Sequence, residues 1–367
     1  MDLISVYLFV CVYARPGIFG THLQPRGKAG IIRPTESAFA FGKGRIAMKL
    51  DCELLPRTGA DYKANLHCHT THSDGKLTPS QTRDAYQAQG YSVVAFTDHR
   101  RYGWYPKLMD DTFVPLAAFE ADLNTPGQDY SYVKTYHMNF YDCAPETRGE
   151  FQALQPDFAY GDTAVLIDYV AGLRAQGFLA CYNHPYWSLQ NYDDYKDLRG
   201  FDYMEIYNHG CEIDGLYGYQ PQAYDEMLRS GQRLGCVATD DNHNWFAFGH
   251  PRCDSFGGAT MLRLPRLGYA EVIHALQNRH YYATTGPELH ELYIENGVLH
   301  VRCSPVEKIY VITAGRNTHS EVSDSGDTLT EAAFPLKGNE GYIRVDCQDT
   351  HRLHAYSCAY WLDEMQK

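Results

Sequence analysis

Histidine and carboxylate side chains recur at short spacings in the sequence, in a pattern that suits metal ions. The first group lies in "ANLHCHTTHSDGKL" (64–77), where His67-x-His69 follows a short apolar run and Asp74 comes soon after. In a strand, residues i and i+2 share a face, so both imidazoles would point one way and Cys68 the other. Such a pair can hold one metal ion. An isolated pair could equally be two surface histidines in a polar loop.

Partners for this pair follow at later apolar runs. They are Asp98 and His99 in "AFTDH", Glu120 in "AAFEAD", His137 within "KTYHMNF", His184 in "CYNHP", and Asp241 and His243 in "CVATDDNH". Strand C-termini in a parallel α/β barrel open onto one face, so these side chains should converge. Six imidazoles with three carboxylates exceed one or two tetrahedral sites and suit three divalent ions with a bridging carboxylate. Such a pocket would attract phosphate and ionise a bound water.

This ordered set resembles the polymerase and histidinol phosphatase (PHP) family. The matching residues are His67-x-His69, Ser73-Asp74-Gly75, Thr97-Asp98-His99, Glu120, His137, Asn183-His184-Pro185 and Asp241-x-His243. The resemblance covers residues 60 to about 287 and implies a distorted (βα)7 barrel, a trinuclear metal site and phosphoester hydrolysis by metal-activated hydroxide. It also implies three ligand sets: His67, His69, Glu120 and Asp241; Glu120, His137 and His184; Asp74, His99 and His243.

Residues beside these ligands have weaker claims. Asp98 is expected to orient a ligand from outside the metal shell, or to be a turn aspartate. The spacing to His243 favours Asp241 over Asp240 as the ligand. His72 lies one residue off the ligand face, so a solvated loop position is expected.

Basic residues near the motifs could bind a phosphate oxygen that does not react. Arg100 and Arg101 follow the Asp98-His99 pair directly, and Arg252 is a third candidate. The alternative for the pair is a solvated basic patch. The candidate catalytic residues are therefore Glu120, Asp98 and Arg100.

Alternating strand and helix patterns place these motifs. Strands are expected at 91–99, 177–185, 201–208 and 234–241, and helices at 78–90, 161–177, 222–232 and 269–279. Repeated β-α units imply a largely parallel sheet, open or closed into a barrel. After residue 287 the pattern changes to short strands, beginning with a hairpin at Asn296-Gly297. We expect a hydrolase barrel at 48–287 and a small, non-catalytic, sandwich-like β domain at 288–367.

Residues 1–47 differ from the rest in composition. They carry six Lys or Arg and two acidic residues, with six Gly and three Pro. After residue 14 their apolar residues show no sustained helical or strand periodicity. They are predicted to lie outside the fold, with the functional protein beginning at or near Met48. The apolar run 3–14 could instead be a signal-peptide core, although Asp2 stands where basic residues are expected.

The bulk composition narrows the class of protein. The net charge of −13 argues against a broad basic surface for duplex nucleic acid, and the twelve-residue apolar run is too short to cross a membrane. Eleven scattered cysteines with no Cys-x-x-Cys favour reduced thiols and a cytoplasmic location.

The functional hypothesis is a phosphoesterase acting on a small phosphorylated substrate with three divalent ions, for which Zn, Mn or Fe would fit. The alternatives are hydrolysis of a C–N or carboxylic ester bond, a metal-dependent binding or regulatory module, and a nuclease. The sequence does not specify the natural substrate, monoesterase or diesterase action, the metal or the oligomeric state.

Overall fold

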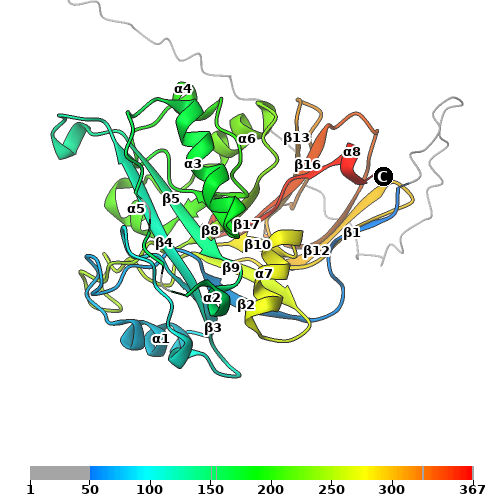
Figure 1. The fold of residues 1–367 in the computed structure, drawn as a ribbon. Helices are drawn as coiled ribbons and strands as arrows, with labels where there is room; N and C mark the ends of the chain where they lie inside the picture. The colour runs from blue at the N-terminus through cyan, green and yellow to red at the C-terminus, as the bar shows by residue number, and fades with distance from the viewer. Residues whose placement is uncertain (1–49, 150, 154, 325, 366–367) are drawn as a thin grey trace, which may run out of the picture. The chain divides into compact units, whose positions relative to one another are not determined.

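The computed structural model describes residues 50–149, 151–153, 155–324 and 326–365, which fall within one compact unit (Figure 1). The predicted N-terminal extension 1–47, the signal-peptide alternative at 3–14 and the predicted start at Met48 lie outside the described residues.

Strands and helices alternate up to residue 284. The strands are β1 (Cys52–Leu55), β2 (Ala60–Asn65), β3 (Tyr91–Phe96), β4 (Val114–Asn124), β5 (Thr135–Asp142), β6 (Phe178–Tyr182), β7 (Tyr203–Asn208), β8 (Gly235–Thr239), β9 (Ala259–Leu264) and β10 (Tyr281–Thr284). The helices are α1 (Pro79–Ala88), α2 (Pro145–Arg148), α3 (Thr163–Ala175), α4 (Tyr192–Tyr195), α5 (His209–Gly215), α6 (Pro221–Arg229) and α7 (Tyr269–Asn278). The four helices predicted from sequence are confirmed as α1, α3, α6 and α7.

The large sheet contains the run β10-β9-β2-β3-β4-β5-β6-β7-β8 and continues beyond β10 into strands from later in the chain. The strands β2, β3 and β4 are mutually parallel, as are β6, β7 and β8. Strand β5 is antiparallel to both of its neighbours, so the expectation of a largely parallel sheet is wrong at this point. The physical reason is that β4 and β5 form a hairpin with a short connection (125–134), whereas a parallel pair needs a longer crossover.

The strands β9 and β8, at the two ends of the run from β9 to β8, come together through a side chain. The Thr260 hydroxyl of β9 accepts from Ala238 N of β8 at 3.2 Å and donates to Ala238 O at 3.0 Å. No strand ladder joins β8 to β9 among the described residues. A closed barrel is therefore not observed, and the architecture is mixed α/β with one large sheet.

Helix α1 shows how local sequence fixes an element beside the histidine motifs. Thr78 accepts from Gln81 N at 3.3 Å, and the Gln81 side chain accepts from Thr78 N at 2.9 Å, which forms a capping box. The helix buries Tyr86 completely, and the Tyr86 hydroxyl donates to Asp240 at 2.8 Å. This contact ties α1 to the chain that follows β8.

Residues from Leu289 onward are rich in strands. They form β11 (Leu289–Glu295), β12 (Val298–Val306), β13 (Lys308–Thr313), β14 (His319–Val322), β15 (Leu329–Pro335), β16 (Tyr342–Gln348), β17 (His354–Ser357) and β18 (Tyr360–Trp361), followed by helix α8 (Leu362–Met365). The predicted hairpin is confirmed between β11 and β12, where Asn296 and Gly297 both have positive φ (51° and 76°).

These later strands are integrated with the earlier part of the chain. Strand β17 pairs with β10, and β1 pairs with β11. The buried Arg344 of β16 donates to both carboxylate oxygens of Asp225 in α6, at 2.8 and 2.7 Å. A separate β domain with a boundary at 287/288 stays a prediction.

None of the helices in the described part of the chain has the length and apolar character needed to cross a membrane. The ten cysteines of that part are all unpaired. The cellular compartment stays a prediction.

Candidate metal centre

The buried carboxylate of Glu120 in β4 lies at the centre of the histidine cluster. Its Oε1 lies 3.0 Å from His137 Nδ1, 3.3 Å from His67 Nε2 and 3.8 Å from His184 Nε2, and its Oε2 lies 2.8 Å from His99 Nδ1 and 3.5 Å from His69 Nε2. Asn183 donates to Oε1 at 2.9 Å. Glu120 therefore has the position that a ligand bridging two ions needs.

Asp241, which follows β8, is the second carboxylate of the inner cluster. Its Oδ1 lies 3.1 Å from both His67 Nε2 and His69 Nε2, and its Oδ2 lies 3.6 Å from His184 Nε2. Asn208 donates to Oδ2 at 3.1 Å. Asp241 and Glu120 thus face the same three imidazoles.

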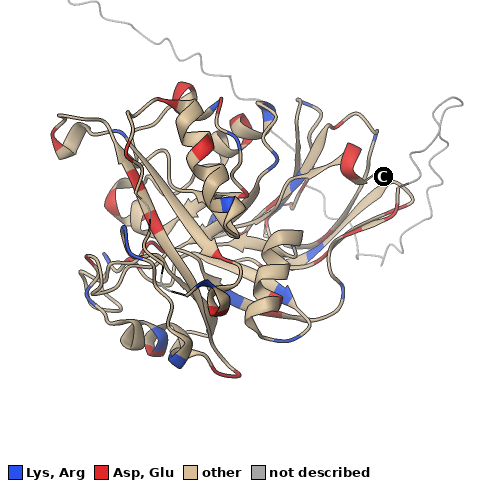
Figure 2. Cartoon of the chain, viewed as in Figure 1, with Lys and Arg blue, Asp and Glu red and all other residues tan. Residues whose placement is uncertain are grey.

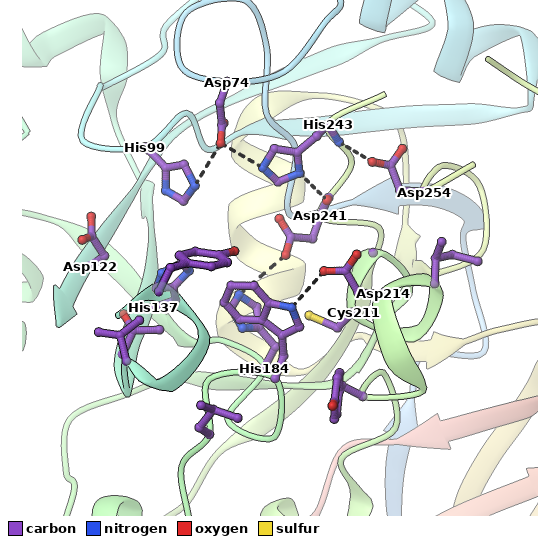
Figure 3. A pocket seen from close by; sticks show the side chains of 18 of the residues that line it. Asp74, His99, Asp122, His137, His184, Cys211, Asp214, Asp241, His243 and Asp254 are labelled. Carbon is purple, nitrogen blue, oxygen red and sulfur yellow. Dashed lines mark hydrogen bonds and ion pairs between the residues drawn. The ribbon is translucent and has the colours of Figure 1, made fainter. Parts of the chain in front are cut away.

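Asp74 forms an outer group with three imidazoles, two of which Figure 3 shows linked to it. Its Oδ2 lies 3.4 Å from His243 Nε2 and 3.8 Å from His99 Nε2, and its Oδ1 lies 3.7 Å from His69 Nδ1. The Asp74 side chain is 50% exposed, whereas Glu120 is fully buried. The outer group therefore lies on the solvent side of the cluster.

Four sets of ligand-type atoms come within 4.8 Å of one another. They are His69, Asp74, His99 and His243; His67, Glu120 and His184; His67, His69 and Asp241; and His184, Cys211 and Asp241. The structure thus brings together all nine side chains named as ligands from the sequence. His137 belongs to none of the four sets and reaches the cluster through its contact with Glu120. The assignment of ligands to particular ions stays a prediction.

Backbone contacts outside the named strands hold the ligands in place. Cys68 forms a parallel bridge with Asn242, and His69 N donates to Asn242 O at 3.1 Å. In the same way, His99 forms a parallel bridge with Glu120. The pair His67 and His69 after β2 and the pair Asp241 and His243 after β8 therefore lie beside each other at one end of the sheet.

His137 reaches the cluster by a different route. It lies in the middle of β5, opposite Asp122 in the antiparallel ladder with β4. The expectation that ligands come from the C-terminal ends of parallel strands therefore does not apply to His137.

Two of the ligand residues have left-handed backbone conformations. The φ angle is 23° at His184 and 52° at Asp241, and neighbouring Arg100 has a φ of 57°. Non-glycine residues adopt such angles at a cost of roughly 1–3 kcal/mol, and they cluster at functional sites. The surrounding contacts must therefore hold these side chains in positions that the backbone alone would not favour.

Carboxylates and imidazoles shift one another's ionisation in the cluster. Burial favours a lower pKa at His67, but Asp241, Glu120 and Glu205 outweigh it and hold the pKa well above its usual range. Burial likewise opposes ionisation of Glu120, yet the nearby imidazoles hold its pKa well below the usual range. By contrast, burial and the neighbouring imidazoles lower the pKa of His69 to about 4. Cations must therefore balance the negative charge of the buried carboxylates. They can be protons on the imidazoles or metal ions.

Asp98 supports the loop that carries the first ligands. Its Oδ1 accepts from Thr70 N and the Ser73 hydroxyl, each at 2.8 Å, and its Oδ2 accepts from the Thr70 hydroxyl at 2.8 Å. These bonds fix the chain between His69 and Asp74. Asp98 therefore lies where an orienting residue would, and it belongs to none of the four ligand sets.

Asp240 points away from the cluster. Its carboxylate accepts from the backbone N–H groups of Phe256, Gly257 and Gly258 at 2.7, 2.9 and 2.8 Å, besides the Tyr86 hydroxyl. Its acceptor capacity is therefore used in shaping the loop before β9, and Asp241 is the member of the doubled pair that meets the imidazoles.

Arg100 lines the cavity described below but is already paired. Its Nε and Nη2 donate to the two oxygens of Asp122 at 2.7 and 2.5 Å. The sequence did not indicate this pairing, which engages part of the guanidinium expected to bind phosphate. Arg101 is not among the lining residues of the cavity.

The remaining basic candidates differ in placement. Arg252 lines the cavity, with its guanidinium carbon 4.7 Å from the centre of the Phe246 ring. His72 Nδ1 is bonded to the Tyr105 hydroxyl at 2.6 Å, and His72 is in none of the ligand sets. The structure therefore keeps Arg252 as a candidate for phosphate and places His72 outside the ligand cluster.

Sequence reasoning missed Glu205, a fully buried residue of β7. Its Oε1 lies 2.7 Å from His67 Nδ1 and accepts from the Thr239 hydroxyl at 2.8 Å. Its Oε2 accepts from His184 N at 3.1 Å and Asn208 Nδ2 at 2.9 Å. Since Nδ1 of His67 is bonded to Glu205, Nε2 is the nitrogen directed at the cluster. The sequence offered one signal for Glu205: it is a charged residue in the middle of the predicted strand "FDYMEIYN".

Two further residues had no spacing signal. Asp254 accepts from the backbone N–H groups of His243 and Asn244 at 2.7 and 3.1 Å, which fixes the loop that carries His243. Cys211 lies in α5 and joins the cluster through His184 and Asp241.

An open cavity of about 1110 Å³ lies over the cluster, and Figure 3 shows the labelled side chains that line it. Asp74, His99, His137, His184, Asp241 and His243 are among the lining residues, so the cluster forms part of its wall. Aromatic side chains are exposed at its edge, among them Tyr130 (78% exposed) and Trp245 (63%). The cavity can admit a small organic molecule next to the ligand cluster.

The donor set fits divalent transition-metal ions. His184 Nε2 is buried and has no hydrogen-bond partner in the described structure, although His184 Nδ1 is bonded to Ser188 at 3.2 Å. An unpaired buried polar atom costs about 1–3 kcal/mol, which a cation bound there would remove. Imidazole and carboxylate groups are ligands that zinc, manganese and iron accept.

No protein-family model and no curated protein matches the chain. Among solved structures, it is similar to a two-domain protein from Bacteroides vulgatus containing a PHP-like metal-dependent phosphoesterase, at 13% identity and a TM-score of 0.43 over 86% of this chain and 100% of the other. A metal-dependent phosphoesterase from Bifidobacterium adolescentis matches at 14% identity and a TM-score of 0.33, over 54% of this chain and 94% of the other.

A third similar structure is an amidohydrolase from Chromobacterium violaceum with bound sulfate and no metal, at 14% identity and a TM-score of 0.32, over 49% of this chain and 87% of the other. Two of the three similar structures carry the name metal-dependent phosphoesterase, one of them as PHP-like, which is the class of protein that the sequence resembles.

Proposed function

We propose that the protein is a metal-dependent phosphoesterase that hydrolyses a small phosphorylated substrate with water activated at a site of three divalent ions. The observation that carries this proposal is the convergence of six imidazoles on Glu120, Asp241 and Asp74 beside an open cavity. Ions held by these ligands would supply Lewis-acid activation of water and neutralise the charge of the phosphate oxygens.

The side chains of the cluster have separate roles in this proposal. Glu120 and Asp241 supply the buried negative charge that holds cations among the imidazoles. Glu205 and Asp98 keep the first ligands in place through the hydrogen bonds described above. Asp74, on the solvent side, lies where an incoming phosphate would meet the cluster.

The cavity favours a small substrate over a polynucleotide. Its volume of about 1110 Å³ is near the size of ordinary small-molecule sites. Lys and Arg residues are scattered among acidic ones in the view of Figure 2 and form no continuous basic stripe on the described residues there. Arg252 is the proposed contact for a phosphate oxygen that does not react.

We also propose the finer description of the fold, a distorted (βα)7 barrel at 48–287 followed by a small β domain at 288–367. The return of β8 to β9 through Thr260 supports the barrel. The described residues of 289–361 form strands and no helix, which supports the second part, and none of the proposed ligands lies there.

Hydrolysis of p-nitrophenyl phosphate by metal-reconstituted protein, with and without chelator, tests the function. We expect two to three ions per chain by elemental analysis and turnover that chelator abolishes. Faster hydrolysis of p-nitrophenyl phosphate than of bis-p-nitrophenyl phosphate would indicate a monoesterase, and the reverse a diesterase.

A matched pair of variants controls this assay. Glu120→Gln should remove activity, whereas Glu226→Gln, the same change in α6 where the side chain contacts Tyr195 and Gln222, should not. Metal-loaded protein that cleaves amides or carboxylic esters but no phosphate ester would contradict the proposal. Metal-loaded protein with no hydrolytic activity would favour a binding module instead.

A further inference from the structure

Cys211 is a potential ligand that the predicted metal site does not use. It is 3% exposed, lies in α5 and lines the cavity. Its sulfur, a nitrogen of His184 and a carboxylate oxygen of Asp241 all lie within 4.8 Å of one another. Figure 3 shows Cys211 among these side chains at the edge of the pocket. A buried thiol thus stands beside two of the residues proposed to bind metal.

The neighbouring imidazole provides a second, independent observation. His184 is 1% exposed, and its Nε2 has no hydrogen-bond partner within the described chain. The nearest carboxylate oxygens are 3.6 Å away at Asp241 and 3.8 Å away at Glu120. A nitrogen of His184 thus shares a space with the Cys211 sulfur and an Asp241 oxygen. The sulfur makes no hydrogen bond among the described residues.

One asparagine fixes the geometry of this trio. The Asn208 side chain accepts from Cys211 N at 2.9 Å and donates to Asp241 Oδ2 at 3.1 Å and Glu205 Oε2 at 2.9 Å. Cys211 and Asp241 are thereby held to the same side chain. Ligand atoms that share a tetrahedral zinc ion stand roughly 3.5 Å apart, so small side-chain rotations would bring the three atoms onto one ion.

We propose that Cys211 is a thiolate ligand of a metal ion that it shares with His184 and Asp241. The inference rests on the metal site of the proposed function and extends its ligand set. On binding, the thiol gives its proton to solvent and the sulfur forms the bond to the ion. A thiolate favours zinc over manganese, because soft sulfur ligands select softer ions and oxygen ligands suit manganese. The consequence is a site selective for zinc.

Cobalt substitution tests this directly in the full-length protein. A sulfur ligand to Co²⁺ produces a near-ultraviolet charge-transfer absorption that nitrogen and oxygen ligands do not. We expect the band in the cobalt-loaded wild type, its loss in Cys211→Ser and its retention in Cys143→Ser. Cys143 is a matched control because it is half-buried after β5 and belongs to none of the ligand sets. In competition between zinc and manganese, Cys211→Ser should retain less zinc than the wild type.

The outcomes separate this inference from the proposed function. A wild-type protein with full cobalt content, phosphatase activity and no charge-transfer band would overturn the Cys211 ligand and leave the function standing. A band that persists in Cys211→Ser would overturn it as well. If Cys211→Ser fails to fold, X-ray absorption of the zinc-loaded wild type decides, since a zinc–sulfur distance of about 2.3 Å must then appear. Protein that binds no metal at all would overturn both proposals.

Discussion

Replacing Glu205 by glutamine tests how a residue that is not itself a ligand supports the ligands His67 and His184. The two oxygens of Glu205 meet four donors: His67 Nδ1 and Thr239 on one side, and His184 N and Asn208 on the other. A glutamine keeps one oxygen and presents an NH2 group to the other pair. One pair of donors must therefore lose its acceptor, whichever way the amide turns.

The expected loss of metal affinity follows from the lost acceptor. If the NH2 group faces His67 Nδ1, this nitrogen must become an acceptor, the proton moves to Nε2, and Nε2 can no longer bind metal. If it faces the other side, His184 N loses its acceptor and Asn208 keeps only its bond to Asp241 as a donor, in a fully buried place. Loss of such outer partners typically weakens metal binding by roughly 10- to 100-fold. At about 1.4 kcal/mol per factor of ten, this equals about 1.4–2.8 kcal/mol.

Competition with a chromophoric zinc chelator measures this change. Glu226→Gln serves as the matched control, because it makes the same substitution at a residue whose contacts are Tyr195 and Gln222. We expect Glu205→Gln to release zinc at a chelator concentration roughly 10- to 100-fold lower than the control. Zinc affinity equal to that of Glu226→Gln, in folded protein, would show that Glu205 does not set the state of His67.

Three further outcomes are expected. Removing metal with EDTA should lower the melting temperature and added zinc should restore it, since a ligand that binds only the folded state stabilises it; an unchanged melting temperature would count against the cluster as a metal site. Glu120→Gln should reduce metal content and turnover more than Asp98→Asn, and equal losses would mean that the assigned roles are wrong. Asp225→Asn leaves the charge of Arg344 buried and unpaired, so urea denaturation should show a loss of about 3–5 kcal/mol; a loss below about 1 kcal/mol would mean that this pair does not stabilise the fold.

The sequence predicted the site wherever spacing carries the information. His67-x-His69 and Asp241-x-His243 place two side chains on one face at a strand's end, and the structure puts both pairs at one cluster. Helix α1 was likewise predictable, because Thr78 and Gln81 form its cap and Gly90 follows its end.

Contacts between distant segments could not be predicted in this way. Glu205 and Cys211 are single residues without a spacing pattern, and their roles depend on which loops meet in space. Arg100 was expected to be available for phosphate, but it pairs with Asp122, which lies 22 positions away on β4. The antiparallel course of β5 also escaped prediction, because a single strand's pattern does not reveal its direction relative to its neighbours.

Contacts between the first and the last described strands have a consequence for biosynthesis. The Tyr360 hydroxyl donates to Leu54 O across 306 positions of sequence, and β10 obtains one of its neighbours only when β17 arrives. At about 5–20 residues per second, a ribosome needs roughly 15–60 s to make the chain between those two residues. Until β11 and β17 have been made, β1 and β10 each lack a partner strand and could pair with other chains. Newly made protein should thus depend on chaperones until translation ends.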